Sequence, residues 1–266
     1  MKKMLVLLSA FVLTIAELAS AGSFSDPFDA LDSAWVTDRF EPAGFSSVVF
    51  DGDNRLEIAI SATDSEANRP AGFTSGFYNT QGRQRDALMA EPWVISGDLY
   101  LSLDMLLGDN LRRTDLWART SDGPEANAQY PIIGMRRFDP LDPFNPLAGD
   151  IASTWRVWDS DTVDGWVNLA TPMVAGWNTL SIESDGLSYL YRINGVEVYE
   201  DLTISAFATD LTTVFLQGYN FGGDYEVYWD NVSAATLAPV PEPATILLLM
   251  LGAGVVAIRR HFAKQQ

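Results

Sequence analysis

Short runs in which apolar and polar residues alternate fill the chain between residues 24 and 234, and they constrain its fold more than any other feature. In the clearest runs, 55–61 and 99–105, every second residue is a large apolar one. A period of two places successive side chains on opposite faces of a β-strand. Gly, Asp, Asn and Pro separate the runs, and no part of this region keeps a helical period. The region is therefore predicted to be all-β.

Turn residues predict how neighbouring runs pair. Asn194-Gly195 separates runs 189–193 and 196–199, and Asn-Gly between alternating runs is a strong hairpin signal. Asp51-Gly52-Asp53-Asn54 separates 47–50 from 55–61 in the same way. About a dozen antiparallel strands of this kind favour two packed sheets around one core. The remaining runs expected as strands are 76–81, 116–119, 132–136, 155–158, 165–169, 177–183, 213–218 and 226–234.

Both ends of the chain have the pattern of targeting segments. Lys2 and Lys3, the apolar run 4–16 and Ala19-Ser20-Ala21 predict a secretory signal peptide over residues 1–21. Near the other end, 244–258 is uncharged and mostly apolar. As a helix it would reach about 22 Å at roughly 1.5 Å per residue, short of the ~30 Å bilayer core. It is predicted to span by local thinning and by snorkelling of the arginines that follow, leaving the region upstream outside the cell.

A family resemblance lies in this C-terminal part. Pro241-Glu242-Pro243, the apolar run and Arg259-Arg260 resemble the PEP-CTERM sorting signal. The resemblance implies that an exosortase in the inner membrane of a Gram-negative bacterium processes the protein on its way to the cell surface or the exopolysaccharide matrix. An ordinary tail anchor that is never cut is the alternative. The expected organisation is a signal peptide over 1–21, a β-sandwich over 22–238 and a sorting signal over 239–266.

Charge and two missing residue types restrict the chemistry of the exported region. Five of the 17 basic residues and two of the 35 acidic residues lie in the terminal segments, which leaves 12 arginines against 33 acids, a net charge near −21. Such a field opposes binding to nucleic acid or anionic lipid and suits divalent cations. The chain has no cysteine, and its one histidine is His261. These absences exclude a thiol nucleophile, a Ser-His-Asp triad and a His-ligated zinc from the sandwich.

A second resemblance concerns the predicted sandwich. The stretch Trp177-Asn-Thr-Leu-Ser-Ile-Glu183, followed by Asp185-Gly186 and the run 191–195, resembles a passage of concanavalin A-like and laminin G-like jelly rolls. The stretches 24–29, 34–35, 53–56 and 227–232 resemble the opening and the last strand of glucanase-like members. The resemblance implies a concanavalin A-like jelly roll, a fold that hosts many activities.

Glycoside hydrolysis is one function that this resemblance raises. It implies two catalytic carboxylates on one strand, arranged as Glu-x-Asp-x-x-Glu, and a retaining enzyme needs them about 5 Å apart. Glu183-Ser-Asp185 supplies the first half, but Ser188 stands where the second acid belongs. Asp185-Gly186 is also typical of a turn. We assign no catalytic residue, and a carboxyl pair assembled across strands stays open.

A structural calcium ion is a second expectation from the resemblance. In this fold, calcium ties the first strand to the last, which points to Asp230 with Asp26 or Asp29. Calcium takes six to eight oxygen ligands, as clustered carboxylates and carbonyls can supply. The alternative is that Asp230 only ends a strand. Asp159-Ser-Asp161-Thr-Val-Asp164 is interpreted mainly as a turn, with metal binding as its alternative.

Aromatic residues suggest a glycan-binding surface. Trp155 and Trp158 are three apart, so on a strand they face opposite ways, one into the core and one outward. We expect Trp158, Arg156 and Trp166 to form a platform for a sugar, although burial in the core is the competing interpretation for any tryptophan. The proline-rich segment 139–150 is expected to be a stiff loop that either binds a partner or packs over the sandwich edge.

These features favour an exported, non-enzymatic surface or matrix protein that binds extracellular polysaccharide. A glucanase-like hydrolase and a purely structural matrix component are the alternatives.

Overall fold

The computed structural model describes residues 22–64, 69, 71–73, 75–108, 111–121, 127–137, 153–163, 165–206 and 208–237. The predicted signal peptide, the sorting signal and the proline-rich segment 139–150 lie outside these residues. Within them, no helix is both long and apolar enough to cross a bilayer.

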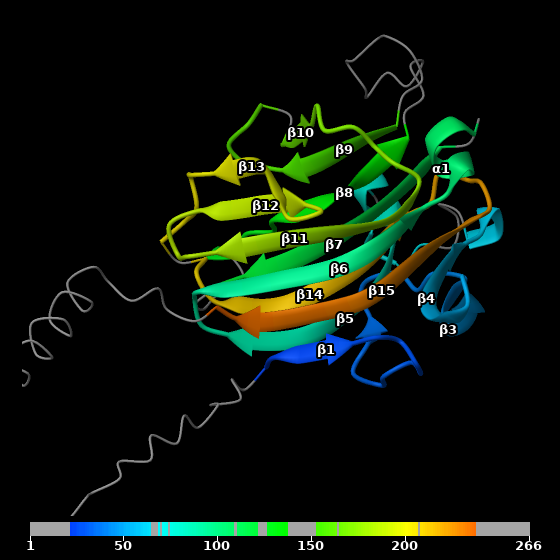
Figure 1. The fold of residues 1–266 in the computed structure, drawn as a ribbon, viewed down its shortest axis with the longest axis horizontal. Helices are drawn as coiled ribbons and strands as arrows, with labels where there is room; N and C mark the ends of the chain where they lie inside the picture. Colours follow the sequence, from blue (N-terminus) through cyan, green and yellow to red (C-terminus); the bar gives the residue numbers. More distant parts are fainter. Residues whose placement is uncertain are drawn as a thin grey trace, which may run out of the picture.

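Two antiparallel sheets packed face to face make up the described part of the chain, which confirms the predicted all-β sandwich (Figure 1). Sheet A has the strand order β13-β12-β11-β6-β15-β4-β3, with β1 paired to β15. Its strands are β1 (Phe24–Asp26), β3 (Gly44–Phe50), β4 (Asp53–Ile60), β6 (Trp93–Leu101), β11 (Gly176–Ser184), β12 (Tyr189–Ile193), β13 (Val196–Asp201) and β15 (Tyr225–Thr236). Sheet B has the order β10-β9-β8-β7-β14-β5-β2. Its strands are β2 (Val36–Thr37), β5 (Thr80–Met89), β7 (Arg112–Thr120), β8 (Ile132–Arg137), β9 (Ser153–Trp158), β10 (Trp166–Asn168) and β14 (Leu211–Tyr219).

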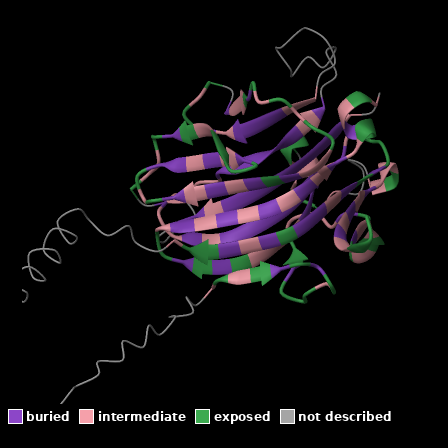
Figure 2. Ribbon diagram, viewed as in Figure 1, coloured by how far each residue is buried: buried purple, intermediate pink, exposed green. Residues whose placement is uncertain are grey.

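The core lies between the two sheets and follows the predicted alternation. Leu56, Ile58 and Ile60 of β4 are buried, while the residues between them are less so. Trp155 of β9 meets this core from sheet B. Figure 2 shows the resulting bands of buried and less buried residues along the strands of sheet A. Burial of large apolar side chains, each worth roughly 1.5–3 kcal/mol, holds the sheets together.

Two hairpins form at the predicted turns. Asn194 and Gly195 both have positive φ, 52° and 76°, so β12 returns as β13 with Ile193 opposite Val196. Asp51 and Gly52 likewise have positive φ and join β3 to β4. Positive φ at both central residues gives the backbone twist that suits a two-residue hairpin loop.

Two predicted strands have different bounds in the structure. In the run 99–105, strand β6 ends at Leu101 and the short helix α1 (Leu103–Leu107) follows. The Ser102 side chain accepts a hydrogen bond from the Met105 N–H and caps this helix. The run 76–81 begins instead as a 3-10 turn, η3 (Gly76–Asn79), capped by Ser75. Its strand, β5, starts only at Thr80. In both places a capping serine outweighs the alternation.

Candidate functional site

The outer face of sheet B, which points away from the core, carries two adjoining pockets of about 300 and 480 Å³. The pockets share Phe77, Arg113 and Trp166, so we treat them as one groove. The described residues that line it are Arg39, Gly76, Phe77, Arg113, Trp117, Tyr130, Ile132, Arg136, Arg156, Trp158, Trp166, Tyr219 and Phe221.

Strand register places a row of polar residues under the middle of the groove. Gln217 of β14 lies opposite Asp115 of β7, Asp115 opposite Gly134 of β8, and Gly134 opposite Arg156 of β9. Because Gly134 has no side chain, Arg156 can extend across β8 to Asp115. A Cβ on Gly134 would lie 2.3 Å from Asp115 Oδ1. Glycine is therefore required here for the ion pair to form.

Rows of different chemistry flank this polar row. On one side, Arg113 of β7 lies opposite Arg136 of β8. On the other side lies an apolar and aromatic row, which consists of Phe215, Trp117, Ile132, Trp158 and Trp166 in adjacent strands. The groove thus has an aromatic wall on one side of a buried carboxylate and cations on the other.

The electrostatics of the groove centre on Asp115, which is fully buried. Arg113 Nε donates to Asp115 Oδ2, and Arg156 Nη2 lies 3.4 Å from both of its carboxylate oxygens. Two guanidinium groups thus share one carboxylate. Burial lowers the pKa of Arg156 well below its usual value, and the charges of Arg113 and Arg136 lower it further, against the opposing effect of Asp115.

Aromatic rings hold the two arginine head groups in place. The Arg156 guanidinium carbon lies 3.6 Å from the centre of the Trp166 ring, and that of Arg113 lies 4.8 Å from it. Cation–π contacts of this kind are worth about 0.5–2 kcal/mol. Arg113 also lies 5.2 Å from the centre of the Tyr219 ring. Packing against these rings therefore fixes the positions of the two guanidinium groups.

Several buried donors at the groove lack a hydrogen-bond partner among the described residues. They are Arg156 Nε, Arg113 Nη2 and Trp117 Nε1, on side chains that are more than nine-tenths buried. Buried polar groups in folded proteins are normally paired. All three of these side chains line the groove.

Three residues that the sequence nominated meet in this groove. Trp155 lies in the core, whereas Arg156 and Trp158 lie on the outer face, as predicted from their spacing. Trp166 stands opposite Trp158 in register, with ring centres 5.1 Å apart and planes at 72°. Gly165 has φ +70°, and a Cβ there would lie 2.2 Å from the Trp158 ring. The glycine lets β10 bring Trp166 against Trp158.

Sequence reasoning missed the contribution of β7. Arg113, Asp115 and Trp117 alternate with core residues such as Leu116, so this run has the same period-two signal as any half-buried strand. An outward strand face that consists of an arginine, an acid and a tryptophan is unusual. This composition was the one feature of the sequence that could have pointed to β7. Phe77 and Tyr219 come from distant parts of the chain, and only pairing of β14 with β5 and β7 brings them near.

Two of the three predicted calcium ligands, Asp26 and Asp230, have an arginine partner. Asp26 accepts hydrogen bonds from the Phe28 N–H and the Trp35 indole N–H, and Arg85 lies 3.4 Å from it. Asp230 pairs with Arg55 at 2.8 Å. For Asp29, the other predicted ligand, the backbone carbonyl accepts a hydrogen bond from Asn54. Calcium between β1 and β15 stays a prediction.

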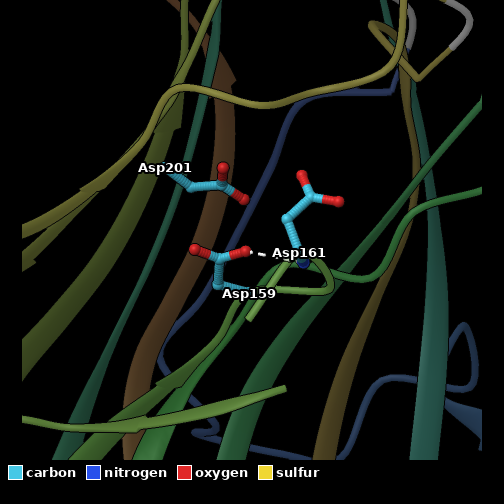
Figure 3. A group of neighbouring side chains, drawn as sticks. All are labelled: Asp159, Asp161 and Asp201. Atoms are coloured by element: carbon cyan, nitrogen blue, oxygen red, sulfur yellow. Dashed lines mark hydrogen bonds between the residues drawn. The ribbon is translucent and has the colours of Figure 1, made fainter. Parts of the chain in front are cut away.

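A second acidic cluster contains Asp159 and Asp161, two of the three carboxylates for which the sequence left metal binding as an alternative. Asp159, Asp161 and Asp201 each place one oxygen within 4.8 Å of the others (Figure 3). Asp159 accepts from the Asp161 N–H and from the Tyr199 hydroxyl, whose pKa is raised to about 12 mainly by this hydrogen bond. Thr162 N–H bonds to Asp159 O, so a turn is confirmed here. Asp164 lies outside the described residues, and metal binding stays a prediction.

The half-motif of the glucanase pattern lies elsewhere. Glu183 is on β11 of sheet A and pairs with Arg192 at 2.9 Å. Asp185 accepts hydrogen bonds from the Leu187 and Ser188 N–H groups, which confirms that it belongs to a turn. Neither carboxylate lines the groove on sheet B.

Comparison with known protein families identifies the C-terminal sorting signal. A family model for the PEP-CTERM protein-sorting motif matches residues 239–260. The chain carries a PEP-CTERM sorting motif. This motif implies exosortase processing and export to the surface or exterior of a bacterial cell. No curated protein matches the chain by sequence.

Solved structures similar to this chain share its concanavalin A-like jelly-roll fold. A sialidase matches 82% of this chain at 10% identity with a TM-score of 0.51, and the chain spans 19% of that protein's length. A family 16 endo-glucanase from Bacteroides ovatus matches 80% of this chain and 99% of its own, at 12% identity and a TM-score of 0.47. A Bacillus licheniformis β-glucanase matches 82% and 99%, at 11% identity and a TM-score of 0.42. At these identities the likeness concerns the fold alone.

Proposed function

We propose that this protein is an exported, non-enzymatic glycan-binding protein of the bacterial cell surface or exopolysaccharide matrix, and that the groove on sheet B is its binding site. Exosortase would process it at the inner membrane of a Gram-negative cell, where the C-terminal segment holds it transiently.

The chemistry of the groove carries this proposal. Its volume falls in the range of roughly 300–1,000 Å³ that is typical of small-ligand sites. Phe77, Trp117 and Trp158 give the groove an apolar wall for a sugar ring, since aromatic side chains supply a large rigid contact area. Trp166 holds the two arginine head groups beside this wall. Arg113 and Arg156 line the groove beside that wall, and each has a buried donor without a partner among the described residues.

The same chemistry favours binding over hydrolysis. A retaining glycosidase needs two carboxyl groups about 5 Å apart, and an inverting one needs them about 6.5–9.5 Å apart. On the outward face of β7, the neighbours of Asp115 two residues away are Arg113 and Trp117. Asp115 itself is buried and engaged by two arginines. A carboxylate that is buried and held by two guanidinium groups is not placed to attack a substrate.

A binding screen with the full chain, purified in detergent, tests the proposal. Neutral and acidic polysaccharides would be compared by affinity electrophoresis, and released reducing ends would be measured in parallel. We expect binding without cleavage, and a loss of binding in Trp166→Ala. Trp177→Ala is the matched control, because Trp177 is a half-buried tryptophan under an arginine on sheet A.

Two outcomes would contradict the proposal. Cleavage of any glycan by the wild type would replace binding with hydrolysis. Failure of the folded protein to bind any polysaccharide would favour a purely structural matrix component.

A further inference from the structure

Resting on the proposed function, we infer that the groove selects an anionic saccharide, one whose carboxylate or sulfate group binds between Arg113 and Arg156. The aromatic wall then takes the neutral part of the sugar chain.

The placement of charge is unusual for this domain. The exported region holds 12 arginines against 33 acids. Four of those arginines, Arg39, Arg113, Arg136 and Arg156, line the groove, and among its described lining residues there is no Asp or Glu. A strongly acidic protein thus gathers a third of its cations on one concave surface. Low-dielectric walls concentrate the field of such a cluster toward its occupant.

The compensation of that charge is incomplete near Asp115. Arg39 has its own acid, Asp38, at 2.5 Å. Within the described part of the chain, Arg113 and Arg156 form ion pairs with one acid only, Asp115. Removing a charge from water costs several kcal/mol per ion unless it is paired. Two cations and one anion leave a deficit of one negative charge, which an acidic ligand would supply.

Two buried donors without a partner belong to arginines that line the groove. Arg113 Nη2 and Arg156 Nε are buried, and no described residue accepts from them. Guanidinium groups bind carboxylate and sulfate oxygens through paired N–H donors, and such charge-assisted bonds are about twice as strong as neutral ones. Both head groups lie over Trp166. A sugar stacked at the groove's edge would therefore bring an exocyclic carboxylate or sulfate to these donors.

The net charge of the domain limits the charge density of the partner. A region near −21 repels a polymer that is anionic at every unit, unless the contact is short in range. The groove is accordingly suited to a glycan with occasional acidic sugars among neutral ones.

Matched ligands test this inference without any mutation. The full chain would be titrated by calorimetry with an oligosaccharide that carries one uronic acid among neutral sugars and with its methyl ester, which removes the charge and keeps the sugar rings. A singly sulfated oligosaccharide against its desulfated form is the sulfate arm. We expect at least a tenfold tighter Kd for the charged member of one pair, weakening as salt rises from about 50 to 500 mM. Preference in the uronate pair identifies a carboxylate, and preference in the sulfate pair identifies a sulfate.

Variants locate the effect in the groove. Arg113→Gln should reduce the preference for the charged ligand to less than threefold, and Arg113→Lys should restore part of it, because charge returns without the planar fork. Arg55→Gln on sheet A is the control and should keep the preference. Circular dichroism and a thermal melt show that each variant is folded.

The outcomes separate this inference from the proposed function. Equal affinity for both members of each pair, with binding still lost in Trp166→Ala, would overturn the anionic selection and leave glycan binding standing. A preference for charge that persists in folded Arg113→Gln would also overturn it. Absence of binding to all four ligands and to the wider polysaccharide screen would remove both.

Discussion

The two outer faces of the sandwich use the same residue types to opposite effect. On sheet A, Arg55 lies 5.3 Å from the centre of the Trp177 ring and pairs with two acids, Asp53 and Asp230. On sheet B, Arg113 and Arg156 lie over Trp166 and share one acid, Asp115. One cation with two anions leaves the sheet A cluster negative, whereas two cations with one anion leave the sheet B cluster positive and able to accept a further anion.

The aromatic rings differ in the same sense. On sheet A, Phe50 stacks on Tyr228 with ring centres 3.8 Å apart, and Tyr100 meets Phe50 edge-on at 4.9 Å. The rings cover one another. On sheet B the rings also contact one another, with Trp158 edge-on to Trp166 at 5.1 Å, but Trp117, Trp158 and Trp166 line a groove. A surface tryptophan beside an arginine therefore indicates a ligand site only where it lines a groove and acids do not fully compensate the arginine charge.

Replacement of the shared acid should give the largest effect. Asp115→Asn leaves Arg113 and Arg156 buried beside a neutral amide, and loss of one partner of a buried ion pair costs about 3–5 kcal/mol. Urea unfolding at pH 7 would measure it. A midpoint equal to that of the wild type would show that the two guanidinium groups do not depend on Asp115, and the contrast between the faces would fail.

Gly134→Ala, which fills the space above β8, should give the next largest loss of stability. Gly134→Ala places a Cβ 2.3 Å from Asp115 Oδ1 and from the Thr114 carbonyl oxygen, so β7 and β8 must shift, at a cost of about 1–3 kcal/mol. Gly44→Ala on sheet A is the control, since its Cβ would meet only Ala59 Cβ, at 3.2 Å. Thermal melts that rank the two variants equally would contradict the role assigned to Gly134.

Asp230→Asn is the matching replacement on sheet A. It should change the free energy of unfolding by no more than about 1 kcal/mol, because Arg55 still pairs with Asp53. Burial raises the pKa of Asp230, although the Asn231 N–H and Arg55 lower it. The folded state then holds this proton more tightly than the unfolded chain does. Protonated Asp230 therefore contributes to the stability of the fold below the unfolded pKa of about 3.9, and this contribution is lost as pH rises through the pKa of the folded state.

Urea melts from pH 3.5 to 7 would detect that dependence. Asp230→Asn should flatten it relative to the wild type. An unchanged pH profile in the variant would contradict a raised pKa at Asp230.

Calcium should give the smallest shift. An ion tying β1 to β15 through Asp26 and Asp230 would have to compete with Arg85 and Arg55. If it binds, EDTA should lower the Tm by about 2–4 °C, which corresponds to roughly 1 kcal/mol for a domain of this size. A melt that EDTA leaves unchanged would remove the calcium proposal.

Local pattern predicted much of this architecture. Leu56, Ile58 and Ile60 share the buried face that their spacing requires, and Asn194-Gly195 forms the hairpin loop that its backbone preferences favour. The opposite faces of Trp155 and Trp158 follow from a period of two. The errors at 99–105 and 76–81 arose where Ser102 and Ser75 cap helical turns, a short-range effect that competes with alternation.

The sequence by itself determined the all-β class, the sorting motif and the exclusion of histidine and cysteine chemistry, because these depend on residue type and on spacing within a few residues. The tertiary structure alone decided that Asp115, Arg156 and Trp166 meet. They come from three strands, and their convergence depends on register across β7, β8, β9 and β10 and on the empty space above Gly134. Register is set by the packing of the whole sheet, and a period of two within one strand carries no information about which strand lies beside it.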